Sequence, residues 1–134
     1  MADIRPVTES FAVAPQIAVE DLDDIADRGF RLVINNRPDG ESPDQPPSTG
    51  FVLAARQAGL DYLHIPVRGM PSADQAEAVY AALQGAQGPT LAFCRSGTRS
   101  LAAWAMGEAA HGRSPEELVR LGRSAGYDLL GLLG

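Results

Sequence analysis

The chain has 134 residues and a formal net charge of −6 at neutral pH. This length suits one well-buried core, so we expect residues 1–134 to form a single domain. The acidic balance, with no basic stripe, argues against a nucleic-acid partner. The sequence has no apolar run of membrane length and no basic-then-apolar leader, so we expect no membrane partner and a cytoplasmic location.

The N-terminal part of the chain predicts a hairpin, a helix and a strand. Short apolar runs at residues 4–7 and 11–14 flank a polar turn, which predicts a small hairpin at the edge of a sheet. Apolar residues recur at helical spacing over residues 19–26, and Gly29 follows as a typical helix end. Residues 30–35 then predict a strand.

The middle of the chain contains an unusually long polar segment. Residues 36–48 are rich in proline and too long for a plain connector, so we expect a functional or mobile loop. The apolar spacing predicts a helix over residues 49–58 and a strand over residues 60–65. A second loop, residues 66–71, follows that strand.

The C-terminal part predicts three more helices around one strand. Ser72 begins a capping box, which predicts a helix through residue 83. Residues 90–93 predict a buried strand, and residues 100–110 predict a helix. Proline at the first position after Ser114 predicts the start of a last helix, which extends to residue 125.

Strands alternate with helices along the chain, which predicts an α/β fold with a mostly parallel central sheet. In such sheets, ligands bind beyond the carboxyl ends of the strands. Three loops are expected to leave those ends: residues 36–48, 66–71 and 94–100. They are the predicted rim of a functional site.

Cys94, the only cysteine, lies directly after the strand of residues 90–93. The following turn leads to a helix N-terminus, where backbone N–H groups and the positive end of the helix dipole converge. Arg95 and Arg99 lie in the same turn, and Gly97 allows the backbone to turn its N–H groups inward. These features favour a thiolate nucleophile beside an anion site over an ordinary buried thiol.

The other residues of this loop have more open roles. Arg99 is the expected anion-binding fork, because a guanidinium holds two oxygens at once. Arg95 either assists it or faces solvent, and Ser100 either donates to the sulfur or caps the helix. The predicted anion-binding loop therefore consists of Arg95, Ser96, Gly97, Thr98 and Ser100.

Three residues outside the loop are further candidates. Asp39 lies in a strong turn sequence, and it either forms the turn or acts as a general acid. His64, at the end of a strand, either orients the cysteine loop or is structural. Arg68 offers another anion contact. No clustered metal ligands and no nucleotide-binding glycine motif occur, so we expect neither a metal nor a cofactor.

The order of four stretches resembles the phosphatase-like domain of the bacterial beta-lactamase-hydrolase-like family. This resemblance implies a cysteine-dependent, dual-specificity-like phosphatase fold. Members of that family are linked to sulfide metabolism and to persulfide dioxygenases, which implies such an enzyme as a partner. The stretches are residues 11–16 (FAVAPQ), 33–40 (VINNRPDG), 64–67 (HIPV) and 94–100 (CRSGTRS).

The cysteine loop itself is similar to the active loop of single-domain rhodaneses, which carry sulfur as a cysteine persulfide. Four residues separate Cys94 from Arg99, as in rhodaneses, whereas phosphatases of this fold have five. Phe93 stands where those phosphatases have a histidine. The resemblance also implies a general-acid aspartate after residues 64–67, but that loop continues with Arg68 and has no aspartate before residue 74.

These departures lead to a first hypothesis of sulfurtransfer, in which Cys94 takes a sulfane sulfur from thiosulfate or a persulfide and passes it to a thiol acceptor. Such a transfer needs no general acid. The alternative is a phosphatase that forms a phosphocysteine, with a phosphoester as its substrate. A third hypothesis is a non-catalytic oxyanion-binding or redox-sensing module.

Overall fold

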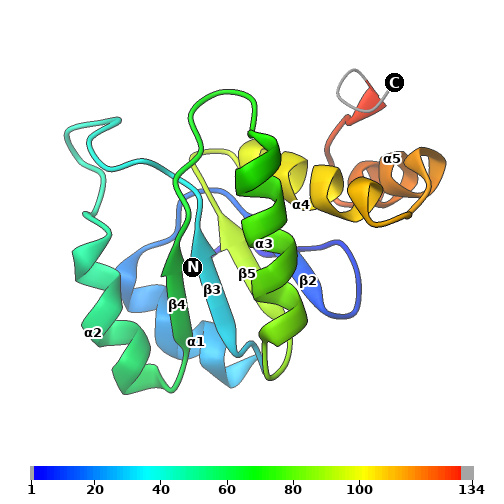
Figure 1. The fold of residues 1–134 in the computed structure, drawn as a ribbon. Coiled ribbons are helices and arrows are strands. Elements are labelled where there is room, and N and C mark those ends of the chain that lie inside the picture. The colour runs from blue at the N-terminus through cyan, green and yellow to red at the C-terminus, as the bar shows by residue number, and fades with distance from the viewer. Residues whose placement is uncertain (1, 131–134) are drawn as a thin grey trace.

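A computed structural model describes residues 2–130 and contains one five-stranded sheet with the order β1-β2-β5-β3-β4. Only β1 runs antiparallel to its neighbour, and β2, β5, β3 and β4 are parallel (Figure 1). The sheet therefore confirms the predicted α/β class. The strands are β1 (Arg5–Pro6), β2 (Phe11–Ala14), β3 (Leu32–Asn35), β4 (Asp61–His64) and β5 (Thr90–Phe93).

Helices cover both faces of this sheet. Residues of α1 and α2 share one apolar cluster with one face of β2, β3 and β5, while α3, α4 and α5 pack on the other face. Within residues 2–130, no helix has the length and apolar character needed to cross a lipid bilayer. The helices are η1 (Val19–Asp21), α1 (Leu22–Asp27), α2 (Thr49–Ala58), α3 (Ala73–Gly85), α4 (Thr98–Ala110) and α5 (Pro115–Ser124).

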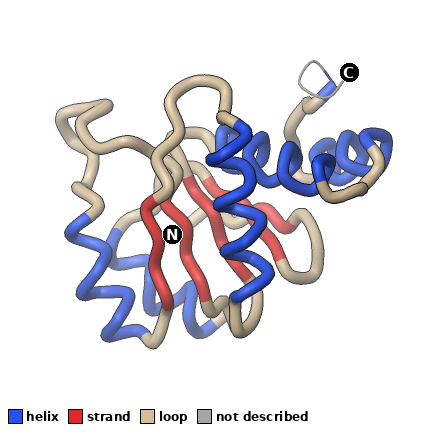
Figure 2. The backbone as a smooth tube through the Cα atoms, viewed as in Figure 1, coloured by secondary structure: helices blue, strands red, loops and turns tan. Residues whose placement is uncertain are grey.

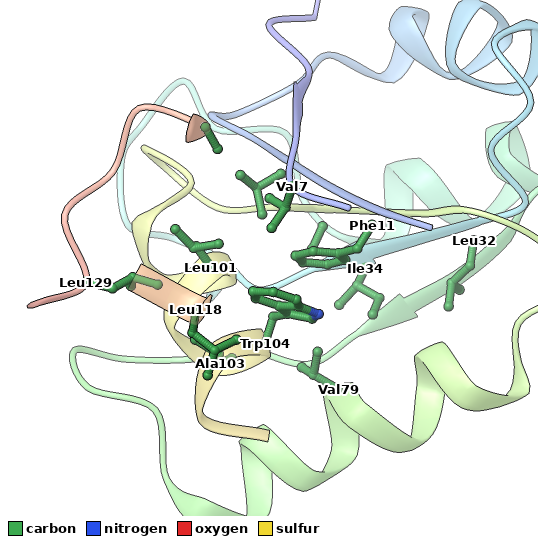
Figure 3. Packing of buried hydrophobic residues seen from close by; sticks show 14 residues of the cluster. Val7, Phe11, Leu32, Ile34, Val79, Leu101, Ala103, Trp104, Leu118 and Leu129 are labelled. Carbon is green, nitrogen blue, oxygen red and sulfur yellow. The ribbon is translucent and has the colours of Figure 1, made fainter. Parts of the chain in front are cut away.

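Aromatic contacts hold the helices that position the cysteine loop. The rings of Phe11 on β2 and Trp104 on α4 stack with centroids 5.1 Å apart (Figure 3). On the opposite face, Phe93 at the end of β5 packs against Phe51 of α2 at 5.4 Å. Because all four side chains are at most 3% exposed, both ends of the cysteine loop are anchored in the core.

The predicted edge hairpin is confirmed, because β1 pairs antiparallel with β2 and is the edge strand of the sheet. One predicted boundary differs from the structure. The helix expected from residue 100 begins at Thr98, so Arg99 lies in its first turn. Gly97 is the N-cap and has no side chain to mark the start, which explains why the apolar spacing placed the boundary too late.

The parallel register brings the three predicted loops to one edge of the sheet. Asn35 of β3 lies opposite both Phe93 of β5 and His64 of β4, so these strands end together. The loops over residues 36–48 and 65–72 leave that edge and rise from the same end of the molecule (Figure 2). The cysteine turn leaves β5 at the same level.

Candidate active site

Cys94 lies at the base of the turn between β5 and α4. Its side chain is fully buried, and its Sγ accepts a hydrogen bond from the backbone N–H of Gly97 at 3.1 Å. The backbone N–H of Cys94 donates to the carbonyl of Ala14 at 3.4 Å, which ties the turn to β2. The sulfur therefore sits at the start of α4 with an N–H donor aimed at it, as the sequence predicts.

Gly97 makes this turn possible. Its φ of +93° lies in the left-handed region, where a side chain is strained. The phenol oxygen of Tyr127 occupies the space that a Cβ would need, and that hydroxyl donates to the carbonyl of Ser96 at 2.9 Å. Tyr127 follows α5, so the C-terminal part of the chain supports the cysteine turn from outside.

Arg99 reaches across the site to the loop over residues 36–48. Its Nη1 donates to Oε2 of Glu41 and to the carbonyl of Val67, both at 2.8 Å, and its Nη2 donates to Oε1 of Glu41 at 2.8 Å. The hydrogen bonds with Glu41 raise the pKa of Arg99, and the nearby charge of Cys94 raises that pKa further. Arg99 is thus held as a cation beside the sulfur.

Glu41 is the main residue of the site that the sequence did not reveal. Its Oε1 also accepts from Nε of Arg37 at 2.9 Å, so one carboxylate joins two guanidinium groups. The hydrogen bonds from Arg99 have the largest effect and, with those from Arg37, lower the pKa of Glu41 to about 2. Glu41 is therefore ionised at neutral pH and is not a proton donor.

The remaining loop residues are more exposed. Ser96 donates from Oγ to Oγ1 of Thr98 at 3.1 Å, and the carbonyl of Arg95 accepts from the backbone N–H of Gln16 at 3.2 Å. The side chains of Arg95 and Arg68 are both exposed at the rim. They are available to an incoming anion, whereas Arg99 is held in one place by its hydrogen bonds to Glu41 and Val67.

Ser100 is buried, and its hydroxyl has no hydrogen-bond partner within residues 2–130. It is the third residue of α4, whose N-cap is Gly97, so it does not cap the helix. The capping interpretation of Ser100 is therefore wrong. Its role as a donor to the sulfur stays a prediction.

Asp39 and His64 both support the long loop. Oδ1 of Asp39 accepts from the backbone N–H of Ser48 at 2.8 Å, closing the loop over residues 36–48. Nε2 of His64 lies 2.9 Å from the carbonyl oxygen of Arg37, within hydrogen-bond distance. These contacts fit the structural interpretation of each residue, and the general-acid role of Asp39 stays untested.

A shallow apolar depression of about 160 Å³ lies beside Arg99. Within residues 2–130, no group of three or more His, Cys, Asp or Glu side chains is arranged to hold a metal ion. The groups that meet at this edge of the sheet include the thiol of Cys94, the guanidinium of Arg99 and backbone donors. The depression is lined by Gly69, Met70, Pro71, Thr98, Arg99 and Ala102.

Comparison with known proteins places this chain in a family of phosphatase-like domains. Residues 3–111 match the family model described as "Beta-lactamase hydrolase-like protein, phosphatase-like domain". A beta-lactamase hydrolase-like protein of Agrobacterium fabrum is 38% identical over 126 residues, which are 92% of this chain. The chain covers 29% of that relative's length.

Solved structures with the same fold are described as phosphatases. A candidate phosphatase from Neisseria meningitidis has 31% identity and a TM-score of 0.86, over 97% of this chain and 93% of its own. The kinase associated phosphatase, solved with its catalytic-site cysteine replaced by serine, has 15% identity and a TM-score of 0.67, over 94% and 83% of the two chains. The latter likeness supports the cysteine-dependent phosphatase fold.

The sulfurtransferase hypothesis is wrong in the light of these findings. The family model and the solved neighbours are phosphatase-like, and they lend no support to sulfur transfer, to a thiol acceptor or to a persulfide dioxygenase partner. The hypothesis relied on the short spacing between Cys94 and Arg99, which is a local likeness to rhodaneses. The order of the four family-like stretches along the chain is the better guide. The chain belongs to the family of phosphatase-like domains of beta-lactamase hydrolase-like proteins.

Proposed function

We propose that this chain hydrolyses phosphomonoesters through a phosphocysteine formed on Cys94. The observation that carries the proposal is the hydrogen bond from the Gly97 N–H to Sγ of Cys94 at the start of α4. An N–H donor and a helix N-terminus stabilise negative charge on sulfur, and the same environment attracts a phosphate dianion. The phosphatase-like family and the solved phosphatase neighbours support the same chemistry.

Arg99 is the proposed binder of the phosphoryl oxygens. It is the one cation of the turn that is fixed by hydrogen bonds, to Glu41 and to the carbonyl of Val67, among residues 2–130. A guanidinium stabilises the charge that spreads over the phosphoryl oxygens in the transition state. Arg95 and Arg68, both exposed at the rim, are proposed to attract the anion without fixing its position.

The proposed reaction has two steps. The Cys94 thiolate attacks phosphorus, an S–P bond forms, and the P–O ester bond breaks with its electron pair leaving on the alcohol or phenol oxygen. The oxygen of a water molecule then attacks phosphorus, and the S–P bond breaks with its electron pair returning to the sulfur. Inorganic phosphate leaves, the water proton passes to the departed oxygen anion or to solvent, and the Cys94 thiolate is regenerated. A buried hydroxyl on Ser100 is proposed to donate to the sulfur as its charge returns.

The depression beside Arg99 favours an aryl ester as the preferred substrate. The depression beside Arg99 is lined by apolar groups such as Met70 and Ala102, which suits a flat apolar leaving group. Glu41, an acid near Arg99, is ionised, and Asp39 is bonded to Ser48. A phenol departs without protonation more readily than an alkyl alcohol, so this arrangement favours aryl phosphates.

We make two broader proposals. Residues 1–134 are proposed to act as one catalytic unit, because Glu41 of the N-terminal half bonds to Arg99 and Tyr127 of the C-terminal part bonds to Ser96. The cytoplasm is the proposed compartment, since a nucleophilic thiol must stay reduced.

Hydrolysis of an aryl phosphate by the purified chain tests the proposal. We expect wild-type turnover that is abolished in Cys94→Ser, while circular dichroism and the unfolding midpoint stay unchanged. Arg99→Lys should be nearly as damaging as Arg99→Ala, because lysine lacks the planar fork. Arg95→Ala, at the exposed neighbour, is the matched control and should lose far less activity.

Near wild-type turnover in Cys94→Ser would overturn the proposal. Absence of any hydrolysis by the wild type, together with tight binding of inorganic phosphate, would also overturn it and would favour the non-catalytic oxyanion-binding module.

A further inference from the structure

Glu41 connects Arg99 at the start of α4 to Arg37, which lies two residues after β3. Its side chain is 25% exposed, and its carboxylate receives hydrogen bonds from both guanidinium groups. Charge-assisted pairs of this fork type fix both the distance and the plane of a guanidinium. The plane of Arg99 is therefore set by a residue 58 positions away in the sequence.

The donors of Arg99 divide into two sets. A guanidinium carries five N–H donors in a fixed plane. Two of them bind Glu41 and a third, on Nη1, binds the carbonyl of Val67. Among residues 2–130, the hydrogen bonds to Glu41 and Val67 leave the N–H of Nε and one N–H of Nη2, which are parallel along one edge of the plane, and Arg99 also interacts with Cys94. Such a pair of parallel donors matches two oxygens of a phosphate.

Arg37 gives this arrangement its anchor. Its side chain is 5% exposed, and its Nη1 donates to Oε1 of Gln16 at 3.0 Å. Its backbone N–H donates to Oδ1 of Asn35 at 2.9 Å, and its carbonyl oxygen lies 2.9 Å from Nε2 of His64. Arg37 is thus held at the carboxyl ends of β3 and β4 and holds Glu41 in turn.

We infer that Glu41 is a positioning residue for Arg99. It binds the Nη1 and Nη2 donors at the end of the Arg99 guanidinium, so that the Nε–Nη2 edge is left for a phosphate at Cys94. The inference rests on the proposed function and deepens it. The opposite role, a carboxylate that competes with phosphate for Arg99, would require both anions to use the same donors. The division of donors argues against that role, because Glu41 and the remaining edge use different N–H groups.

Binding of inorganic phosphate to the full chain, measured by isothermal titration calorimetry, tests the inference. We expect Glu41→Gln to weaken phosphate binding by about tenfold or more, as the loss of one charge-assisted contact predicts. Glu77→Gln removes a carboxylate that pairs with His111 on the exposed side of α3, and it should bind phosphate like the wild type. Glu41→Asp keeps the charge and should recover part of the affinity.

A double-mutant cycle separates positioning from general support of the fold. In an Arg99→Ala background, Glu41→Gln should change the phosphate Kd by less than about twofold, because residues that act through one another are not additive. A residue that only supports the loop would weaken binding equally in both backgrounds. Unchanged or tighter binding in Glu41→Gln, or full additivity, would overturn the inference.

Phosphate binding and phosphoester hydrolysis can fail independently of each other. Suppose that the wild type binds phosphate, that the Glu41→Gln variant does not, and that the wild type hydrolyses no phosphoester. The positioning role then stands and the phosphatase proposal fails. If hydrolysis depends on Cys94 but Glu41→Gln binds phosphate normally, only the positioning role fails. A wild-type chain that binds no phosphate would overturn the positioning role as well.

Discussion

The hydroxyl of Tyr127 fills the position that a Cβ on Gly97 would take, and it closes the cysteine turn by donating to the carbonyl of Ser96. Gly97 therefore serves the site twice, through its left-handed φ and through its missing side chain. The same residue provides the N–H that binds Sγ of Cys94. A change at this position should disturb the nucleophile directly.

We predict that Gly97→Ala lowers kcat/KM for an aryl phosphate by at least about tenfold, because the alanine must displace Tyr127 and move the N–H from the sulfur. Gly29→Ala is the matched control, since Gly29 has a similar φ of +98° but open space around its Cβ position. The control should lose only the strain of a left-handed alanine, about 1–2 kcal/mol of stability, and keep its activity. Steady-state kinetics and denaturant unfolding measure both. Equal activity losses in the two variants would contradict the role assigned to Tyr127.

Ser100→Ala should lower kcat by about tenfold, the effect of losing one hydrogen bond to a charged group. The variant should unfold at the same or a higher denaturant concentration, because the buried hydroxyl has no partner among residues 2–130 in the resting protein. Parallel kinetics and urea unfolding separate the two effects. A clear loss of stability with unchanged kcat would make Ser100 a structural residue.

Aryl phosphates should be hydrolysed much faster than alkyl phosphates. General-acid assistance is worth about 10²–10⁴ in rate, and this assistance is what an alkyl ester would lack. Asp39→Asn keeps an oxygen for the Ser48 N–H and should leave aryl hydrolysis unchanged. Brisk alkyl hydrolysis that falls sharply in Asp39→Asn would instead assign the general acid to Asp39.

The Glu41 ion pairs predict a dependence of stability on acid. The pKa of Glu41 falls from 4.5 to about 2 in the folded chain, mainly through hydrogen bonds from Arg99. A lowered folded-state pKa means that the stabilisation is complete above pH 4.5 and is lost as the pH falls toward 2. The difference in unfolding free energy between the wild type and Glu41→Gln should follow this course in acid titrations. A difference that grows as the pH falls would contradict the assigned pairs.

The sequence predicted the elements well because their signals are local. The capping box at Ser72 and the proline start after Ser114 each mark a helix that the structure contains. The apolar runs around residues 32–35 and 90–93 mark the two central strands. Such patterns involve residues that are close together in the sequence. The sequence alone therefore predicts which loops leave the carboxyl ends of the strands.

The contacts that shape the site could not be predicted in the same way. Glu41 pairs with Arg99 across 58 positions, and the partner depends on how the loop over residues 36–48 folds back on itself. Tyr127 reaches Ser96 only because α5 packs beside α4. Asp39 is the acid that the sequence indicates on this loop, whereas Glu41, a carboxylate held by two arginines, leaves no local pattern.

Trapping of the covalent intermediate tests the central claim most directly. The wild-type chain is mixed with an aryl phosphate carrying radioactive phosphorus, the reaction is quenched within one turnover, and the digested peptides are analysed by mass spectrometry. The account predicts labelled phosphate bound to the sulfur of Cys94, and no label in Cys94→Ser. Turnover without a phosphocysteine, or label on any other residue, would contradict it.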